Sequence, residues 1–549
     1  MEFDAVLLPA RRPRMIEQGL WHERTILQDL AQCIQERPET VALTAIRVES
    51  GAVTRFTYKE MDTMARRIAV GLSRLGVKRN DVVACQLPNW WEFTLLYLAC
   101  SYIGAVMNPL MHIFRERELG FMLKHGEAKV VVAPRQFRGF DYETMYKSLQ
   151  ASLPELQHAV IIDGEGPNSF EALLSGPEWE NEPDAAELLQ RNPAGPDDIT
   201  QLIYTSGTTG EPKGVMHTAN SLMSNIIPYA QRLKLNSDDV VLMASPMAHQ
   251  TGFMYGLMMP IMLKARAVLM DIWQPEKAIE TILAEKCSFT MASTPFLTDL
   301  TRGVVESGKS LPSLRTFLCA GAPIPGPLVE QARSALGIKI ISAWGMTENG
   351  AVTTTRPEDD DERSFNTDGL PLPGVELRVV DDNDQPVPVG ESGRLLLRAC
   401  SNFVGYLKRP QWNSTDADDW FDTGDLARLD DQGYVRITGR SKDVIIRGGE
   451  NIPVVEIESL LYRHPAIALA AIVAYPDERL GERACAVVVL KPGQEFDMDE
   501  MVSWLKSNKV AIQYMPERLE ILDEMPATPS GKIQKFKLRE MVQPKEANT

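Results

Sequence analysis

Residues 204–215 read YTSGTTGEPKGV, a stretch rich in glycine and hydroxyl groups with a single lysine, Lys213. Glycines let a backbone approach a ligand closely, and backbone amides, hydroxyls and a lysine together can surround a polyphosphate. The common phosphate-binding loop needs Gly-Lys followed directly by Ser or Thr, whereas here Pro212 precedes the lysine and Gly214 follows it. Alone, the stretch is equally explained as a flexible surface loop. As a phosphate loop, its binding residues would be Thr205, Ser206, Gly207, Thr208, Thr209 and Lys213.

Six further stretches carry residues suited to chemistry. They are SPMAHQTGF (245–253), CAGAPIP (319–325), AWGMTENG (343–350), WFDTGD (420–425), GRSKDVIIRGGENI (439–452) and PATPSGKIQK (526–535). Singly they have ordinary explanations, such as a turn aspartate or a solvent-facing lysine. In this order and spacing, the seven stretches resemble the core motifs of the adenylate-forming superfamily of acyl-CoA synthetases, luciferases and peptide-synthetase adenylation domains. The resemblance runs from about residue 25 to about residue 540.

The resemblance implies a two-step reaction that uses ATP, Mg²⁺ and coenzyme A. A carboxylate attacks the α-phosphate of ATP to give an acyl-adenylate and pyrophosphate, and a thiol then displaces AMP to form a thioester. The 204–215 loop would hold the β- and γ-phosphates. Negative charge accumulates at phosphorus in the transition state, so positioned cations and donors would stabilise it.

The resemblance also assigns the ATP-binding residues. Glu348 is expected to ligate Mg²⁺ and Thr347 to touch the α-phosphate. Asp425 would accept both ribose hydroxyls, since an ionised carboxylate is acceptor-only, and Arg440 would help to hold the ribose or the phosphates. Trp344 would stack on the adenine where the family usually has tyrosine. The residues expected to line the base are Gly321, Ala322 and Pro323, and Ala320 stands where the family often has glycine.

The C-terminal motifs imply a lysine that acts in the first half-reaction and a domain that moves. The Lys532 ammonium would bridge the substrate carboxylate and the α-phosphate, which offsets the repulsion between two anions. The resemblance implies a large rotation about Lys442 after adenylation. The rotation would bring Gly448 and Gly449 to line the pantetheine tunnel, although a tight turn also explains this pair.

The motif around His249 and the apolar residues after it suggest that the substrate is an apolar acid. His249 matches the family position that borders the carboxylate, and Gln250 stands where aryl-acid enzymes often have asparagine. Phe253, Met254 and Met258 follow; methionines are adaptable, so they would suit a flexible or alicyclic acyl chain, or would simply fill the core. We therefore expect a short- to medium-chain or alicyclic acid such as cyclohexanecarboxylate.

Two alternatives remain open. The first is an aryl-acid adenylase or aryl-CoA ligase that takes a benzoate-type acid and loads a carrier protein or coenzyme A. The second is a non-catalytic acyl- or nucleotide-binding protein of the same fold. Loss of Lys532, Glu348 or Asp425 would mark the second alternative, and all three are present.

The pattern of strands and helices around these motifs predicts an α/β protein. Short β-branched runs such as DVVACQLP, AKVVVAP and RTFLCAG alternate with helical patterns up to about residue 300 and beyond, which predicts doubly wound parallel sheets. After about residue 365 the alternation becomes antiparallel in style and suggests a small β-barrel. We place a large N-terminal domain at residues 1–440 and a small mobile C-terminal domain, carrying the catalytic lysine, at residues 441–549.

Bulk properties limit the partners. The 549 residues exceed one hydrophobic core, and the net charge of −17 argues against nucleic acid. The longest apolar run is too short to span a bilayer and no secretory signal is evident, so a soluble cytoplasmic enzyme is expected. The seven scattered cysteines predict buried reduced thiols. A homodimer is compatible with the sequence, which leaves the oligomeric state open.

One regulatory partner is also expected. Pro526 lies six residues before Lys532, and this spacing resembles the acetylation sites of bacterial acyl-CoA synthetases. A lysine acetyltransferase acting on Lys532 is therefore a candidate partner. Acetylation would remove the charge on Lys532, so adenylation would fall while thioester formation from a preformed acyl-adenylate would largely survive.

Overall fold

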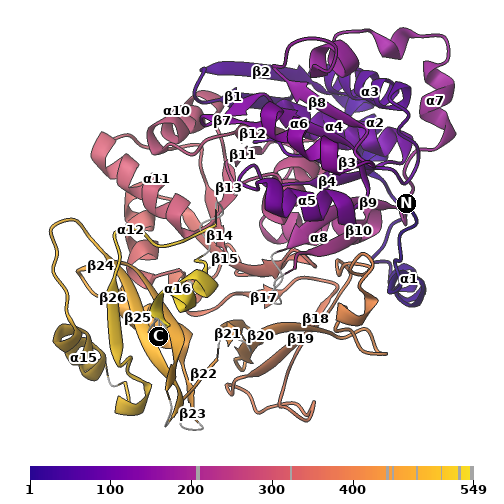
Figure 1. Cartoon of the computed structure of the whole chain (residues 1–549). Coiled ribbons are helices and arrows are strands. Elements are labelled where there is room, and N and C mark those ends of the chain that lie inside the picture. Colours follow the sequence, from indigo (N-terminus) through magenta and orange to yellow (C-terminus); the bar gives the residue numbers. More distant parts are fainter. Residues whose placement is uncertain are drawn as a thin grey trace, which may run out of the picture.

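The computed structural model describes residues 1–205, 211–321, 324–440, 444–447, 450–477, 480–508, 510–528 and 533–543. These residues form an α/β protein in which two large sheets and their helices make up the N-terminal part, and a smaller unit follows at the lower left of Figure 1. The predicted fold class is confirmed. All seven cysteines lie in the described ranges and are buried.

The first sheet contains nine strands within the described residues, and its central pairs are parallel while both of its edges are antiparallel. The strands are, in spatial order, β17 (Leu370–Pro371), β16 (Gly350–Thr354), β15 (Lys339–Met346), β14 (Thr316–Ala320), β13 (Phe289–Ala292), β11 (Val240–Met243), β12 (Arg266–Met270), β1 (Val41–Arg47) and β2 (Ala52–Thr57). The predicted run RTFLCAG contains β14, and its parallel pairing with β13 and β15 confirms that β-branched runs between helices form a parallel sheet.

The second sheet has six strands in the same described ranges and is parallel except for its last pair, β9 and β10. Its spatial order is β10 (Lys213–Thr218), β9 (Ile199–Thr205), β4 (Val106–Pro109), β3 (Val82–Cys85), β5 (Ala128–Pro134) and β8 (His158–Ile162). Tyr204 and Thr205 end β9, and residues 213–215 begin β10, so both described ends of the stretch 204–215 lie in paired strands. A short ribbon, β6 (Gln136–Phe137) with β7 (Phe140–Asp141), lies apart from both sheets.

Helices cover the sheets and connect their strands (Figure 1). In chain order they are α1 (Leu8–Glu17), α2 (Ile26–Glu36), α3 (Tyr58–Arg74), α4 (Trp91–Ile103), α5 (Glu116–His125), α6 (Tyr142–Ser152), η1 (Glu171–Ser175), η2 (Trp179–Asn181), α7 (Ala185–Arg191), α8 (Ala219–Arg232), η3 (Gly252–Met258), α9 (Met259–Leu263), α10 (Pro275–Glu285), α11 (Thr294–Ser307), α12 (Gly326–Leu336), α13 (Asp361–Asn366) and η4 (Pro410–Trp412).

Local sequence signals explain where these helices begin and end. Thr57 and Glu60 form a capping box at the start of α3, with Glu60 N donating to Thr57 Oγ1 at 3.2 Å. Helix α4 is apolar almost all round and nearly all its residues are buried, which is typical of a helix enclosed by other elements. It ends at Gly104, whose φ of +66° is the left-handed cap that glycine adopts readily.

An antiparallel sheet follows the two large ones. Its strands are β18 (Val375–Val380), β19 (Gly393–Ala399), β20 (Phe421–Leu429) and β21 (Val435–Arg440). The predicted antiparallel strands are confirmed. Their order in the described residues is an open β18–β19–β20–β21, rather than the closed barrel that the sequence suggested.

The C-terminal unit has its own sheet and its own apolar clusters. Its elements are β22 (Ile445–Arg447), β23 (Glu450–Ile452), α14 (Val454–Tyr462), β24 (Ile467–Asp477), β25 (Gly481–Leu490), α15 (Met498–Ser507), η6 (Ile512–Tyr514), β26 (Arg518–Ile521) and α16 (Lys535–Val542). The main core of the N-terminal part, by contrast, joins residues of both large sheets. A boundary at Arg440–Ser441 remains our proposal.

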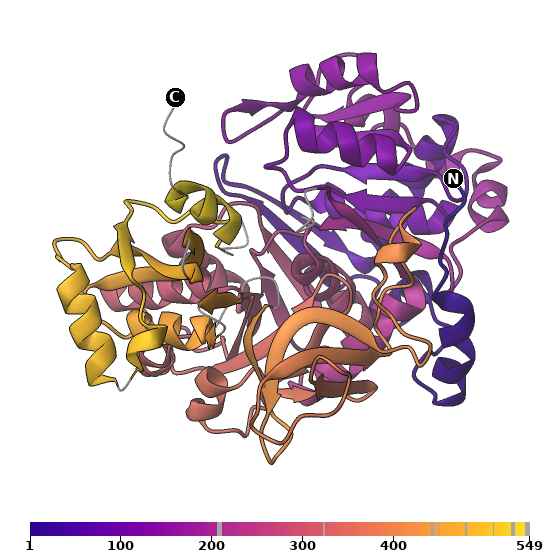
Figure 2. The same ribbon diagram turned by 60° about the horizontal axis from the view of Figure 1, so that its bottom comes forward.

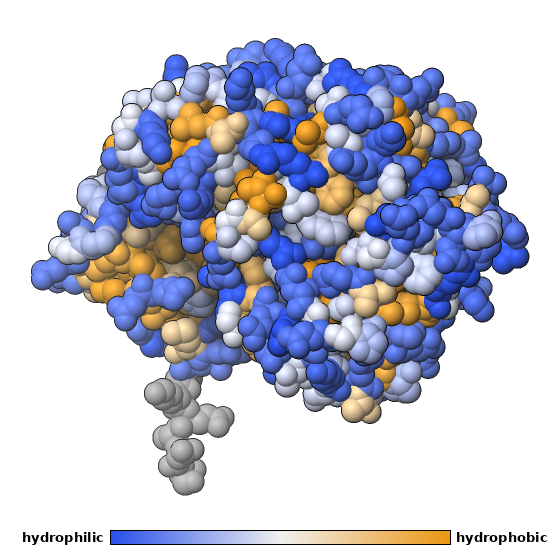
Figure 3. All heavy atoms as spheres, turned by 90° about the horizontal axis from the view of Figure 1, so that it is seen from above, coloured by the Kyte–Doolittle hydropathy of each residue, from blue (hydrophilic) through white to orange (hydrophobic). Residues whose placement is uncertain are grey.

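The surface matches the composition of the chain. Seen from above, hydrophilic side chains cover most of the face and hydrophobic ones lie in scattered groups (Figure 3). None of the described helices combines the length and the apolar character that a bilayer-spanning helix needs.

Candidate active site

The predicted motifs follow the carboxyl ends of strands in both large sheets. The loop 244–249 follows β11, Gly321 follows β14, and Thr347 follows β15. In the other large sheet, β9 ends at Thr205, where the phosphate loop is expected to begin. Ligands of open α/β sheets bind beyond the carboxyl ends of parallel strands, so these residues mark one candidate site.

Glu348 is buried and is held at both its backbone and its side chain. It has 5% of its surface exposed, and its Oε1 accepts a 2.7 Å hydrogen bond from the hydroxyl of Tyr406. The amide of Phe403 donates to the Glu348 carbonyl at 2.7 Å. A buried carboxylate needs a cation or donors to stay ionised, and Tyr406 supplies one such donor.

Lys213 places a positive charge over the ring of the same tyrosine, Tyr406. Its Nζ lies 4.6 Å from the ring centroid of Tyr406 and 5.5 Å from that of Trp412. Burial lowers the pKa of Lys213, and the nearby Glu348 carboxylate opposes this shift. A cation and a carboxylate around one aromatic ring match a bound polyphosphate with its metal, because each group would find an opposite charge there.

The chemistry of Glu348 fits Mg²⁺. Hard cations prefer carboxylate oxygens, and Mg²⁺ is usually held by one or two carboxylates together with substrate phosphates. No group of three or more His, Cys, Asp or Glu side chains able to hold a metal occurs in the part of the chain that the structure describes. A metal at Glu348 would thus depend on ATP oxygens for its remaining ligands.

The carbonyl of Thr347 is held from behind by a buried histidine. His217 Nε2 lies 2.8 Å from that oxygen, and Nδ1 lies 3.0 Å from Ser221 Oγ. Burial lowers the pKa of His217 to about 4, so the ring is neutral near pH 7. Because a carbonyl only accepts, Nε2 must carry the proton. The segment that carries Glu348 is therefore fixed in place.

Asp425 links the expected ribose and adenine sites. Its Oδ2 accepts from the indole Nε1 of Trp344 at 3.0 Å, and its Oδ1 pairs with Nε of Arg440 at 3.0 Å. Asp425 has 4% of its surface exposed and pairs with Arg440 across β20 and β21. A carboxylate offers about four lone-pair sites, so capacity remains for two ribose hydroxyls. The structure thus brings Trp344, Asp425 and Arg440 together.

The loop that carries His249 is held by hydrogen bonds from Asn89, which lies between β3 of the second sheet and α4. Asn89 Nδ2 donates to the carbonyls of Met243 (3.3 Å) and Ser245 (2.9 Å), and its Oδ1 accepts from the amide of Met247 at 2.8 Å. Asn89 is 3% exposed. The next residue after His249, Gln250, is also buried, and its Oε1 accepts from Gln201 of β9 at 2.9 Å. Both contacts join the acyl loop to the second sheet.

The apolar residues predicted after His249 are Phe253, Met254 and Met258, and all three are buried in the main core cluster. They lie in η3, a π-helix, a form found frequently at functional sites. The ring of Phe253 packs against Phe93 and Tyr97 of α4, with a centroid distance of 4.8 Å to Tyr97. Met254 faces Gly350, where an added Cβ would lie 2.8 Å from its sulfur.

The hydroxyl of Tyr255 in η3 is already engaged. It donates to Asn225 Oδ1 at 2.6 Å and accepts from the amide of Ala351 at 2.8 Å. All the other side chains of η3 are apolar. Within this fully described segment, no polar group is left to bind a polar substituent of a substrate.

Several predicted residues lie outside the described residues. These are Ser206, Gly207, Thr208, Thr209, Ala322, Pro323, Lys442, Gly448, Gly449 and Lys532. Their described neighbours are placed. Thr205 pairs with Lys213, Gly321 has a φ of +92°, and Ala527 and Ile533 form a bridge on either side of the segment that contains Lys532.

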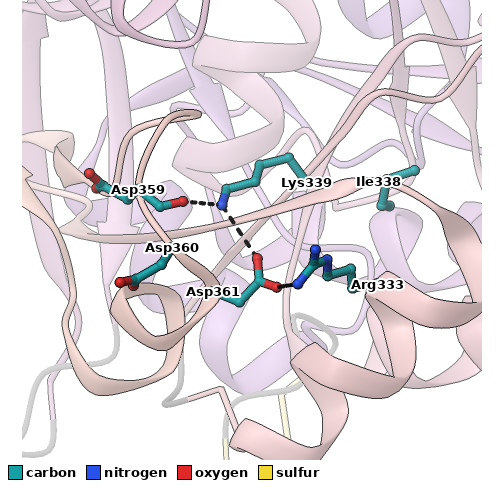
Figure 4. Close-up of a pocket in the computed structure, with 6 residues that line it drawn as sticks. All are labelled: Arg333, Ile338, Lys339, Asp359, Asp360 and Asp361. Carbon is teal, nitrogen blue, oxygen red and sulfur yellow. Dashed lines mark hydrogen bonds and ion pairs between the residues drawn. The ribbon is translucent and has the colours of Figure 1, made fainter.

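A separate surface pocket lies at the opposite end of β15. Arg333, Ile338, Lys339 and residues 359–361 line it (Figure 4). Its charges pair with one another: Asp361 contacts Arg333 at 2.5 Å and Lys339 at 3.4 Å. Lys339 begins β15, whereas Trp344 and Glu348 lie at or beyond its carboxyl end, so this pocket is not part of the candidate active site.

Three supporting residues were missed by sequence reasoning: Tyr406, His217 and Asn89. Tyr406 lies 58 residues from Glu348, and a bridge to Val215 beside β10 brings it to the site. His217 lies just beyond the predicted loop 204–215, and extending that motif by two residues would have included it. Asn89 precedes a helix in the segment QLPNWW, and nothing in its local sequence indicates a partner 154 residues away.

Comparison with known proteins gives consistent matches along the chain. The family model for an AMP-binding enzyme matches residues 30–407, and that for the AMP-binding enzyme C-terminal domain matches residues 456–532. A medium-chain fatty-acid–CoA ligase of Escherichia coli (strain K12) is 37% identical over 96% of this chain and 92% of its own length. A salicylyl-CoA synthase / salicylate adenylyltransferase of a Streptomyces species is 33% identical, covering 97% of this chain and 96% of its own.

The solved structures agree with this result. The ATP-bound structure of MatB from Rhodopseudomonas palustris superposes with a TM-score of 0.80 and 26% identity, covering 94% of this chain and 99% of that chain.

Proposed function

The chain belongs to the family of AMP-binding enzymes, and from this premise we propose that it activates a short- to medium-chain or alicyclic carboxylic acid, such as cyclohexanecarboxylate. It is an AMP-forming acid–thiol ligase that works with ATP, Mg²⁺ and coenzyme A. The identity of the acid and the roles of individual residues are the subject of the proposal.

The residues around Glu348 would serve the first half-reaction. Glu348 would hold Mg²⁺, and Lys213 would contact the β- and γ-phosphates, which gain negative charge in the transition state as they leave as pyrophosphate. Asp425 and Arg440 would bind the ribose, with the face of Trp344 against the adenine. Thr347, fixed by His217, would contact the α-phosphate.

The C-terminal residues would complete both half-reactions. Lys532 would bridge the substrate carboxylate and the α-phosphate, and rotation about Lys442 would replace it with the hairpin of β22 and β23. Gly448 and Gly449, between those strands, would then line the path of the pantetheine thiol. Mobility of residues 441–549 is part of this proposal.

The observation that carries the substrate proposal is the apolar wall beside Gly350. Met254 faces Gly350, and the hydroxyl of Tyr255 is already occupied at both its donor and its acceptor positions. Along η3 a hydroxylated or charged acyl group would find no side chain to replace its hydrogen bonds to water, which costs free energy, whereas an alkyl or alicyclic group would lose none. The E. coli relative named for medium-chain fatty acids supports the same choice.

An aryl acid is the second candidate, and the relative named for salicylate favours it. An unsubstituted benzoate ring is apolar and would suit the same wall. The two candidates differ in their expected thiol, because an adenylase that loads a carrier protein does not turn over with coenzyme A alone.

Pyrophosphate release tests the proposal. The enzyme is given ATP, Mg²⁺ and one acid at a time from butyrate to decanoate, cyclohexanecarboxylate, benzoate and 2,3-dihydroxybenzoate, with and without coenzyme A. We expect coenzyme A-dependent turnover to be fastest on an aliphatic or alicyclic acid. Fastest turnover on 2,3-dihydroxybenzoate, or one stoichiometric burst that coenzyme A does not convert to turnover, would contradict it.

A further inference from the structure

A buried arginine from the N-terminal segment lies directly behind the Glu348 site. Arg11, on α1, has 1% of its surface exposed. Helix α1 lies beside the segment of about residues 400–420 in both views of the ribbon (Figures 1 and 2). Residues 1–29 precede the part of the chain that the family model matches, so nothing in that match assigns Arg11 a role.

Each nitrogen of the Arg11 guanidinium has an acceptor. Nη1 donates to the carbonyls of Asn402 (2.7 Å) and Phe403 (2.6 Å). Nε donates to Asp419 Oδ2 at 2.9 Å, and Nη2 donates to Asp419 Oδ1 at 2.6 Å. A buried charge needs this degree of pairing, and the planar fork of arginine fixes the direction of every bond.

One residue that Arg11 holds, Phe403, also holds Glu348. The amide of Phe403 donates to the Glu348 carbonyl at 2.7 Å, so the Asn402–Phe403 peptide group is held by both Glu348 and Arg11, and Arg11 also holds the Phe403 carbonyl. The Phe403 ring lies 4.6 Å from that of Tyr406, whose hydroxyl donates to Glu348 Oε1. Arg11 therefore supports both contacts to Glu348 without touching it.

Other bonds tie the same N-terminal segment to the same loop. Leu7 N donates to the carbonyl of Val404 at 3.2 Å, Trp21 Nε1 donates to that of Cys400 at 2.8 Å, and Asp4 Oδ1 accepts from the amide of Lys408 at 3.1 Å. Contacts on both sides of residues 402–403 limit the motion of the loop, so a substitution of Arg11 should displace mainly these two residues.

We propose that Arg11 is a positioning residue for adenylation, which holds residues 402–406 so that Tyr406 and Phe403 aim the Glu348 carboxylate at Mg²⁺. This proposal rests on the metal role of Glu348 in the proposed function. Partners beyond the direct ligands of a metal typically change affinity or activity by about 10- to 100-fold. The effect is expected on adenylation, the half-reaction that releases pyrophosphate. Thioester formation begins only after pyrophosphate has left.

The test compares Arg11→Met with Arg14→Met in the full-length enzyme. Arg14 lies on the same helix and pairs with the same Asp419, but no bond from it to the carbonyls of Asn402 and Phe403 is seen among the described residues. Acid-dependent exchange of pyrophosphate into ATP is measured against Mg²⁺ concentration. Thioester formation from preformed acyl-adenylate and coenzyme A is measured separately.

We expect Arg11→Met to raise the half-maximal Mg²⁺ concentration about tenfold or more, with thioester formation within about twofold of the wild type and Arg14→Met close to the wild type. An unchanged Mg²⁺ dependence, or equal losses in both half-reactions, would overturn the proposal. If Arg11→Met does not fold, Arg11→Lys against Arg14→Lys decides in the same way, since a single ammonium cannot bond both carbonyls and both Asp419 oxygens in the arginine geometry. Failure of the wild type to exchange pyrophosphate with every acid would instead contradict the proposed function.

Discussion

Around Glu348, side chains from separate segments meet through hydrogen bonds and charges, whereas around Met254 the neighbours are apolar and the one hydroxyl is occupied. Tyr406, Lys213 and the Phe403 amide converge on the first region. Gly350 and the π-helix η3 form the second. In the proposed function, the first region serves the reaction step that is common to all acids, and the second region selects the acid.

The largest loss of activity is expected when the charge of Glu348 is removed. Glu348→Gln keeps the size of the side chain but loses the carboxylate, so acid-dependent pyrophosphate exchange should fall by about a hundredfold or more, the scale of losing a positioned electrostatic group. The loss should be similar for every acid that the wild type accepts. The exposed Glu358→Gln is the matched control. A loss below tenfold would argue against Glu348 as the metal ligand.

Removing only the hydroxyl behind Glu348 should give a smaller, equally general loss. Tyr406→Phe removes a hydrogen bond to a charged group, worth about 1.5–3 kcal/mol, so kcat/KM for adenylation should fall about 10- to 100-fold. Tyr434→Phe controls for the loss of a buried tyrosine–carboxylate bond elsewhere, because Tyr434 donates to Asp359 at 2.8 Å. Steady-state kinetics at several ATP and Mg²⁺ concentrations would measure both variants.

Changing the apolar wall should alter the choice of acid instead. Met254→Ala removes side-chain volume beside Gly350, so the ratio of kcat/KM between a bulkier and a smaller acid should rise by about 3- to 30-fold, the range for small changes in an apolar pocket. Met243→Ala is the control, because Met243 packs beneath η3 against Gly256. If both variants destabilise the enzyme but only Met254→Ala shifts the ratio, the wall is identified. Identical ratios in both would remove Met254 from the pocket.

The smallest effect on turnover is expected at Glu92, a buried residue near the start of α4 that takes no part in the reaction. Burial raises the pKa of Glu92, near the start of α4, to about 7, although Arg47 lies 2.8 Å away and favours the charged form. A raised pKa means that the folded state binds the proton more tightly, so this stabilisation is present below about pH 4.5 and is lost as pH rises through about 7.

Glu92→Gln should therefore raise the free energy of unfolding relative to the wild type at pH 8, by at most about 3 kcal/mol, and change it little at pH 5. Denaturant unfolding at the two pH values measures this difference, and the ratio between acids should stay within twofold of the wild type. A variant that loses stability at pH 8 would show that the ion pair with Arg47 outweighs burial.

The sequence predicted the residues of the motifs, but not the residues that hold them from distant segments. Motif order predicted Glu348, Asp425 and Trp344 with their reaction, and alternation of apolar runs predicted the parallel strands that carry them, because both signals are local. Tyr406, Asn89 and Arg11 act through bonds between segments that are 58 to 392 residues apart in the chain. The sequence also left open whether Met254 and Met258 fill the core or line the pocket, and both are buried in the main core cluster.

One measurement decides whether the reaction and the choice of acid are served by separate neighbouring regions. The kcat/KM of adenylation is measured over the full panel of acids for the wild type, Tyr406→Phe and Met254→Ala. We predict that Tyr406→Phe lowers every value by a common factor and preserves the ranking, while Met254→Ala changes the ranking. A reordered ranking in Tyr406→Phe, or a uniform loss in Met254→Ala, would contradict the claim.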